Sequence, residues 1–71
     1  MTGDRVLGSV LRSLRQAAGM SQADLAVASG VYKPALSRYE NGHVMPSIPS
    51  LIEIGHAVGV PASEILARAG M

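Results

Sequence analysis

Apolar residues recur at helical spacing in four or five short segments of this chain, and Gly or Pro separates each segment from the next. One segment of about eight residues is too short to form a stable helix alone, so it must pack against its neighbours. Alternation with a period of two never lasts more than a few residues, which argues against strands. The pattern predicts an all-α fold, a compact bundle of five short helices.

The composition agrees with one small domain that occupies residues 1–71. Apolar residues make up 48% of the chain, which is enough to close a core. Most of them are small or aliphatic, and Phe and Trp are absent, so we expect closely packed helices and no large ligand cavity. The lack of Cys excludes a disulfide scaffold, a thiolate zinc site and a cysteine nucleophile, and it agrees with a cytoplasmic location.

Several functional classes find no support in the sequence. The longest uncharged stretches, residues 41–52 and 54–63, contain Pro and Gly and are too short to span a bilayer. His43 and His56 stand apart without other ligands, and no paired-carboxylate or glycine-loop motif is present. We therefore expect neither an enzyme nor a cofactor or metal. The net charge of +1 says little about nucleic acid.

Helix boundaries are indicated by capping residues and by glycines. The first segment is expected over residues 4–18; the fourth begins after Ser47 and ends at Gly59. The fifth follows Pro61 and ends near Gly70. One apolar stripe marks the first segment and consists of Leu7, Val10, Leu11, Leu14 and Ala18.

The second and third segments are the most informative pair. The second begins at Ser21, which can form a capping box with Asp24, and it ends at Gly30. The third covers residues 33–40, with Pro34 in its first turn. Two short helices joined by a tight turn that contains Gly form the helix-turn-helix pattern.

Six positions in register strengthen this interpretation. A small residue at Ala26 suits the close crossing of two helices, and Gly30 can adopt a positive φ in the turn. The other four positions supply the apolar wedge between the two helices and the core, and they are Leu25, Val31, Leu36 and Tyr39.

A wider pattern runs along the chain and consists of the segments 22–26, 30–31 and 36–42, Pro46, and the run from Leu51 to Val60. This pattern resembles the lambda-repressor-like helix-turn-helix family, also called the Xre or Cro/C1 type. The resemblance covers about residues 6–67. It implies a five-helix DNA-binding domain, usually a dimer on a palindromic operator. In that family the second motif helix enters the major groove and the first crosses the DNA backbone.

The resemblance also implies roles for individual residues. Arg38 matches a base-reading position and suits a bidentate contact with guanine, whereas Pro34 offers only an apolar contact. The implied base readers are Lys33, Pro34, Ser37 and Arg38. The implied phosphate contacts are Gln22, Tyr32, Asn41 and His43, together with the backbone after Gly42. Arg15 and Glu40 match an ion pair that ties the first helix to the end of the recognition helix.

Three residues depart from the family pattern. Tyr32 replaces a common Ser or Thr, so we expect no side-chain cap on the third helix. His43 is the only basic residue in the loop that follows Gly42, so few phosphate contacts are expected from this loop. Pro34 stands where a polar base reader is common. Arg5 and Arg12 are interpreted as solvated surface charges.

The leading hypothesis is a sequence-specific regulator of transcription that binds double-stranded DNA as a homodimer on a palindromic operator. It resembles phage repressors, restriction–modification controllers and antitoxin-like autoregulators about equally, and a toxin or RNA polymerase is a possible protein partner. Apolar residues of the C-terminal half are the candidate dimer contacts: Val44, Met45, Val60, Ile65, Leu66 and Met71. The alternative is a protein-interaction module that keeps the fold without binding an operator.

Overall fold

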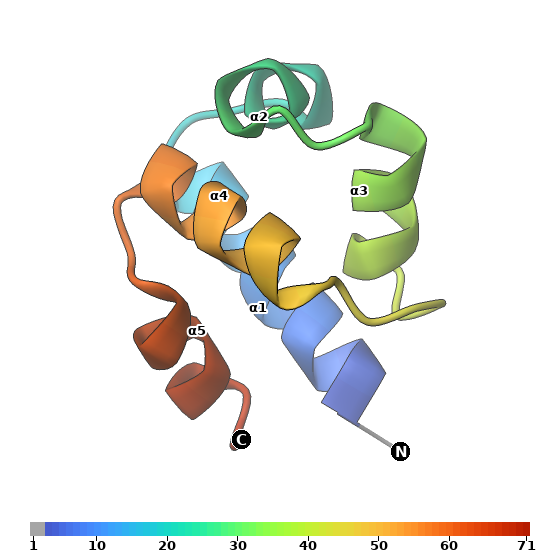
Figure 1. Cartoon of the computed structure of the whole chain (residues 1–71), viewed down its shortest axis with the longest axis vertical. Helices are drawn as coiled ribbons and strands as arrows, with labels where there is room; N and C mark the ends of the chain where they lie inside the picture. The colour runs from blue at the N-terminus through green and yellow to red at the C-terminus, as the bar shows by residue number, and fades with distance from the viewer. Residues whose placement is uncertain (1–2) are drawn as a thin grey trace.

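The computed structural model describes residues 3–71, which form five α-helices around one core (Figure 1). The helices are α1 (Gly3–Ala17), α2 (Gln22–Ser29), α3 (Lys33–Glu40), α4 (Ile48–Val58) and α5 (Ala62–Arg68). Helix α1 packs against α3 and α5, and α2 packs against α3 and α4. Residues 3–71 contain no strand, so the predicted all-α fold is confirmed.

The helix ends follow local capping chemistry. The Oγ of Ser21 accepts the backbone N–H of Asp24 at 3.0 Å, and the Asp24 carboxylate accepts the N–H of Ser21 at 3.0 Å. The hydrogen bond from the Ser21 backbone to the carboxylate, followed by the Ser21 side chain, lowers the pKa of Asp24. The cap therefore stabilises α2 at pH values above the ordinary pKa of aspartate. This stabilisation is lost as the pH falls and the carboxylate is protonated. At the other end of α2, Gly30 adopts φ 72° and donates to Ala26 O.

The core consists of aliphatic side chains from every helix. The buried members are Leu7, Leu11, Leu14, Leu25, Leu36, Leu51, Ile54, Ile65 and Ala69. The expected stripe of α1 is confirmed except at Ala18, which is exposed because α1 ends one residue before it. The core thus holds both motif helices against α1 and α4.

Helix α1 and the C-terminal end of α3 approach each other at backbone level. A Cβ atom at Gly8 would lie 2.5 Å from Tyr39 O and 2.7 Å from Glu40 O. Both neighbours are backbone atoms, so they cannot move aside as a flexible side chain would. The expectation of close helix packing is met here, at a glycine that the sequence pattern did not single out.

A buried carboxylate joins three helices. The Glu40 side chain is 0% exposed and receives two hydrogen bonds from Arg15, at 2.8 and 3.1 Å. Gln22 donates to the same carboxylate at 3.2 Å, so α1, α2 and α3 meet on this one group. The remaining terminal nitrogen of Arg15 donates to Met20 O at 2.9 Å. The hydrogen bond with Glu40 raises the pKa of Arg15.

The ion pair that the resemblance implies between Arg15 and Glu40 is therefore present, and both side chains are largely buried. Arg12 differs from its interpretation as a solvated surface charge. Its Nε lies 3.5 Å from Glu40 Oε1, and its Nη2 donates to Asn41 Oδ1 at 2.8 Å. Spacing explains this result, because Arg12 lies one turn before Arg15 on α1 and follows the same face toward α3.

We expect Gly8→Ala to destabilise the domain by about 1–3 kcal/mol, because the added methyl group meets two carbonyl oxygens. Alanine has the higher helix propensity, so a net loss isolates the steric effect. Urea denaturation measures the change. The control Ser13→Ala, at an exposed position of α1, should leave stability nearly unchanged; equal stability of both variants would contradict the close approach.

We expect Glu40→Gln to lower the free energy of unfolding by about 3 kcal/mol, because it leaves two guanidinium groups without their shared counter-charge. Thermal unfolding followed by circular dichroism provides the measurement. The matched control is Glu64→Gln, which removes the exposed pair with Arg68 on α5 and should cost less than about 1 kcal/mol. Similar losses of unfolding free energy in the two variants would mean that the burial of Glu40 does not increase the contribution of its ion pairs to stability.

Candidate nucleic-acid interface

The turn between α2 and α3 holds the two motif helices at a fixed angle. Leu25 and Leu36 are fully buried, and the other two wedge residues, Val31 and Tyr39, pack partly buried against the core, as does Ala26. The Ser29 hydroxyl donates to Leu25 O at 2.7 Å and accepts the N–H of Val31 at 3.2 Å. The side chains to which the sequence assigned the wedge thus lie in the core or against it.

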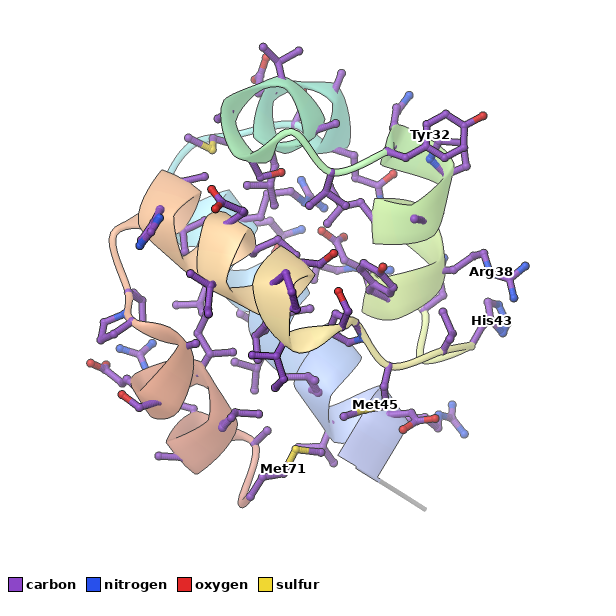
Figure 2. The ribbon with its side chains drawn as sticks, in the orientation of Figure 1. Tyr32, Arg38, His43, Met45 and Met71 are labelled. Atoms are coloured by element: carbon purple, nitrogen blue, oxygen red, sulfur yellow. The ribbon has the colours of Figure 1, made fainter. Side chains whose placement is uncertain are left out.

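Apart from the buried Glu40, the side of α3 opposite Leu36 faces away from this core. Lys33, Pro34 and Arg38 are exposed, and Ser37 is half-buried. All four proposed base readers belong to one short helix, and Arg38 points outward at the edge of the molecule (Figure 2). No carboxylate of residues 3–71 lies within ion-pair distance of Lys33 or Arg38, so both charges are open to a ligand.

The residues implied as phosphate contacts lie around the ends of α3. Tyr32 precedes the helix and is 75% exposed; its side chain makes no cap bond, as expected. Figure 2 shows Tyr32, Arg38 and His43 along the same edge of the molecule. Gln22, at the start of α2, is half-buried and braces Glu40.

The side chain of Asn41 is committed to protein partners. Its Nδ2 donates to Ser37 O at 2.9 Å and approaches Ser37 Oγ at 3.4 Å, while its Oδ1 accepts from Arg12. This arrangement caps the C-terminal end of α3 and fixes the orientation of the amide. It also places Asn41 beside Ser37, as expected for two residues four apart at the end of a helix.

The backbone after α3 is committed as well. The N–H groups of Asn41, Gly42 and His43 donate to carbonyl oxygens of α3 at 3.0, 3.1 and 3.0 Å. The expectation that the backbone around Gly42 grips phosphate therefore fails for the N–H of His43, because it already closes the last turn of α3. The imidazole of His43 is exposed, so it remains a candidate phosphate contact.

Charge is unevenly distributed over the helices. Helices α1 and α3 carry five of the six basic residues, and only Asp4 and Glu40 among the acidic ones. Because Glu40 is buried against arginines, the exposed surface of these two helices is mainly basic. The small net charge of the chain thus hides a basic side, which the composition alone could not show.

The residues proposed for a dimer contact divide into two groups. Val44, Met45 and Met71 are exposed, and Met71 retains 51% of its accessible surface. Val60 and Leu66 are half-buried against the core. Ile65 was wrongly assigned to the surface: it is 0% exposed, because the inner side of α5 faces the core.

Further exposed apolar side chains were missed in the sequence. Ile48 and Ile52 lie one turn apart on α4, outside the buried stripe of that helix, and are 61% and 39% exposed. Val6 on α1 is also exposed. A signal for the α4 pair exists in the sequence, since the two positions lie off the stripe that begins at Leu51.

Neither a metal-binding cluster nor a membrane span is found among residues 3–71. No three His, Cys, Asp or Glu side chains of residues 3–71 are grouped so that they could hold a metal ion. Within the same range, none of the helices combines the length and hydropathy that a membrane span requires.

Comparison with known proteins agrees with this geometry. A family model described as Helix-turn-helix matches residues 11–65. An uncharacterized HTH-type transcriptional regulator of Mycobacterium tuberculosis is 42% identical over 64 residues, which are 90% of this chain and 46% of that protein. The HTH-type transcriptional regulator SutR of Escherichia coli is 36% identical over 62 residues, 87% of this chain and 35% of SutR. The chain thus spans less than half the length of these curated relatives.

Two solved structures share the fold over nearly the whole chain. The clp gene regulator ClgR of Corynebacterium glutamicum superposes with a TM-score of 0.90 at 33% identity, covering 99% of this chain and 90% of that one. The restriction–modification controller protein C.AhdI of Aeromonas hydrophila superposes with a TM-score of 0.82 at 30% identity, covering 86% of this chain and 92% of that one. The motif residues, the five-helix fold and these likenesses together show that the chain belongs to the helix-turn-helix family of the Cro/C1 type.

Proposed function

We propose that this chain is a sequence-specific DNA-binding regulator of transcription that acts as a homodimer on a palindromic operator in the cytoplasm. Helix α3 enters the major groove, and α2 lies across the backbone. The observation that carries the proposal is the outward presentation of Lys33 and Arg38, with the half-buried Ser37 beside Arg38, on a helix whose other side is buried.

The chemistry of these side chains suits base edges. The planar guanidinium of Arg38 matches O6 and N7 of guanine, and Lys33 can approach the same acceptors as a point charge. Pro34 offers only an apolar surface, which fits the methyl group of thymine. Clamping of α3 at Glu40 supports this role, because a rigid helix keeps its readers in register with successive base pairs.

Dimerisation supplies specificity that one short helix lacks, since two-fold symmetry doubles the base contacts. The exposed apolar residues of the proposed interface are Val44, Met45 and Met71. Met45 and Met71 both lie toward the lower end of the molecule in Figure 2, away from Tyr32. Phage-repressor, restriction–modification and antitoxin contexts are all compatible with this arrangement.

Selection from random duplex DNA at near-physiological salt tests the proposal directly. We expect an enriched inverted repeat whose half-sites lie about one helical turn apart, because a symmetric dimer presents two copies of α3 to one side of the duplex. A folded protein that enriches no sequence would contradict operator binding and would favour the alternative interaction module.

Arg38→Ala should weaken binding to the selected operator by about 1–3 kcal/mol and relax the preference at one base pair in each half-site. Fluorescence anisotropy with single-base operator variants measures both effects. Arg68→Ala, which removes an exposed arginine of α5, serves as control and should bind like the parent protein. An unchanged base preference in Arg38→Ala would show that Arg38 is not a reader.

Met45→Asp should shift the protein from dimer toward monomer, because it places a charge in the proposed apolar contact. Sedimentation velocity at high micromolar concentration, with and without operator, measures the shift. Val27→Asp adds the same charge at an apolar residue of α2 that is 86% exposed, and in the absence of operator it should leave the association state unchanged. A parent protein that stays monomeric under all conditions would exclude the homodimer.

A further inference from the structure

A polar hollow lies between α1 and the C-terminal end of α3. It encloses about 240 Å³ and is lined by Arg5, Ser9, Arg12, Glu40 and Asn41. The three residues from α1 follow one another at helical spacing, so they form one side of the hollow. Two of its five lining residues are arginines, and neither had a functional role in the sequence analysis.

Two glycines bring the walls of this hollow together. Gly8 allows α1 to reach the last carbonyl groups of α3. Gly42, at φ +75°, packs on Arg5: a Cβ atom there would lie 2.9 Å from both the Cα and the Cγ of Arg5. The backbone and the stem of Arg5 are therefore held against the turn that follows α3, next to Asn41.

The negative charge at the back of the hollow is already neutralised. Glu40 Oε1 accepts hydrogen bonds from Arg15 and Gln22 and lies 3.5 Å from Arg12 Nε, while Oε2 accepts from Arg15. The carboxylate thus needs no further donor. Its presence orients Arg12 and does not by itself exclude an anion.

Unused guanidinium donors remain in the hollow. Arg12 uses Nε and Nη2 for the bonds to Glu40 and Asn41, which leaves Nη1 without a partner in residues 3–71. Arg5 is exposed and has no carboxylate of residues 3–71 within ion-pair distance. Guanidinium groups bind phosphate through charge-assisted hydrogen bonds, so the hollow offers chemistry that a phosphate group requires.

The hollow also lies where the proposed binding mode places DNA backbone. Helix α3 has eight residues and is thus about 12 Å long, close to the roughly 12 Å width of the major groove. A helix seated in the groove therefore has a phosphate strand near its end. The backbone N–H groups of residues 41–43 are occupied there, so the neighbouring arginines are the available donors.

We propose that Arg5 and Arg12 bind a phosphate group of the DNA backbone in this hollow, at the C-terminal end of α3. The assignment rests on the proposed function and adds a phosphate contact from α1, an element that had no predicted role at the DNA. Ser9 and Asn41 line the site, and Asn41 holds Arg12 in place.

The test is the salt dependence of DNA binding by Arg5→Gln. Each lost phosphate contact should reduce the slope of log K against log salt by about 0.9, so a bound dimer should lose about twice that. The loss should be equal on the selected operator and on a random duplex, because phosphate contacts carry no sequence information. Arg68→Gln, on α5, is the matched control and should keep the parent slope.

Arg12→Gln is a second variant, and its salt dependence should have the same reduced slope as that of Arg5→Gln. Its thermal unfolding is also recorded, because Arg12 contacts Glu40 and its loss can lower stability. NMR signals of the Arg5 and Arg12 side-chain N–H groups should shift when the random duplex is added, whereas that of Arg68 should not.

The possible outcomes separate the two proposals. If the parent protein binds its operator and Arg5→Gln keeps the parent slope, the phosphate site is overturned while the regulator function stands. If Arg5→Gln instead changes the preference at one base pair without changing the slope, Arg5 reads a base and the phosphate assignment is likewise wrong. If the parent protein binds neither duplex at low salt, both proposals are overturned.

Discussion

The burial of Glu40 among the ends of three helices is the constraint on which this small domain depends. Its carboxylate receives donors from α1 and α2 and belongs to the last turn of α3. A buried charge of this kind is tolerated only with full hydrogen bonding, so the three helices must keep their relative positions for the group to stay satisfied. A chain of 71 residues with an aliphatic core gains in this way an orientation that apolar packing alone specifies less sharply.

The same arrangement explains how a helix of eight residues can present the proposed reading surface. Alone, α3 would be unstable; here Leu36 anchors it in the core, and Glu40 and Asn41 secure its C-terminal end. The side facing outward is then free to carry residues chosen for a ligand rather than for packing. Arg12 links the two roles, because it contacts the buried carboxylate and also lines the polar hollow beside the helix.

The distribution of charge over the helices suits the proposed DNA-binding dimer. The basic residues gather on α1 and α3, whereas α4 and α5 carry Glu53 and Glu64 with Arg68 as their only arginine. Val44 and Met45 are exposed apolar residues in the connection from α3 to α4. A dimer formed through them would fix the distance between two copies of α3, which is the quantity that sets operator spacing.

The sequence by itself determined the elements of this protein. Helical spacing, the capping box at Ser21 and the glycine at position 30 are local signals, so they predicted five helices and the helix-turn-helix with boundaries within about one residue. The register of the motif also identified Leu25 and Leu36 as core and Lys33 and Arg38 as exposed. Only the tertiary structure decided which distant residues meet. Burial of Ile65, the approach at Gly8 and the joining of Arg12 to Glu40 and Asn41 depend on how α1 crosses α3 and how α5 closes the core. Those crossings result from the packing of all five helices together, and no local pattern of residues contains that information.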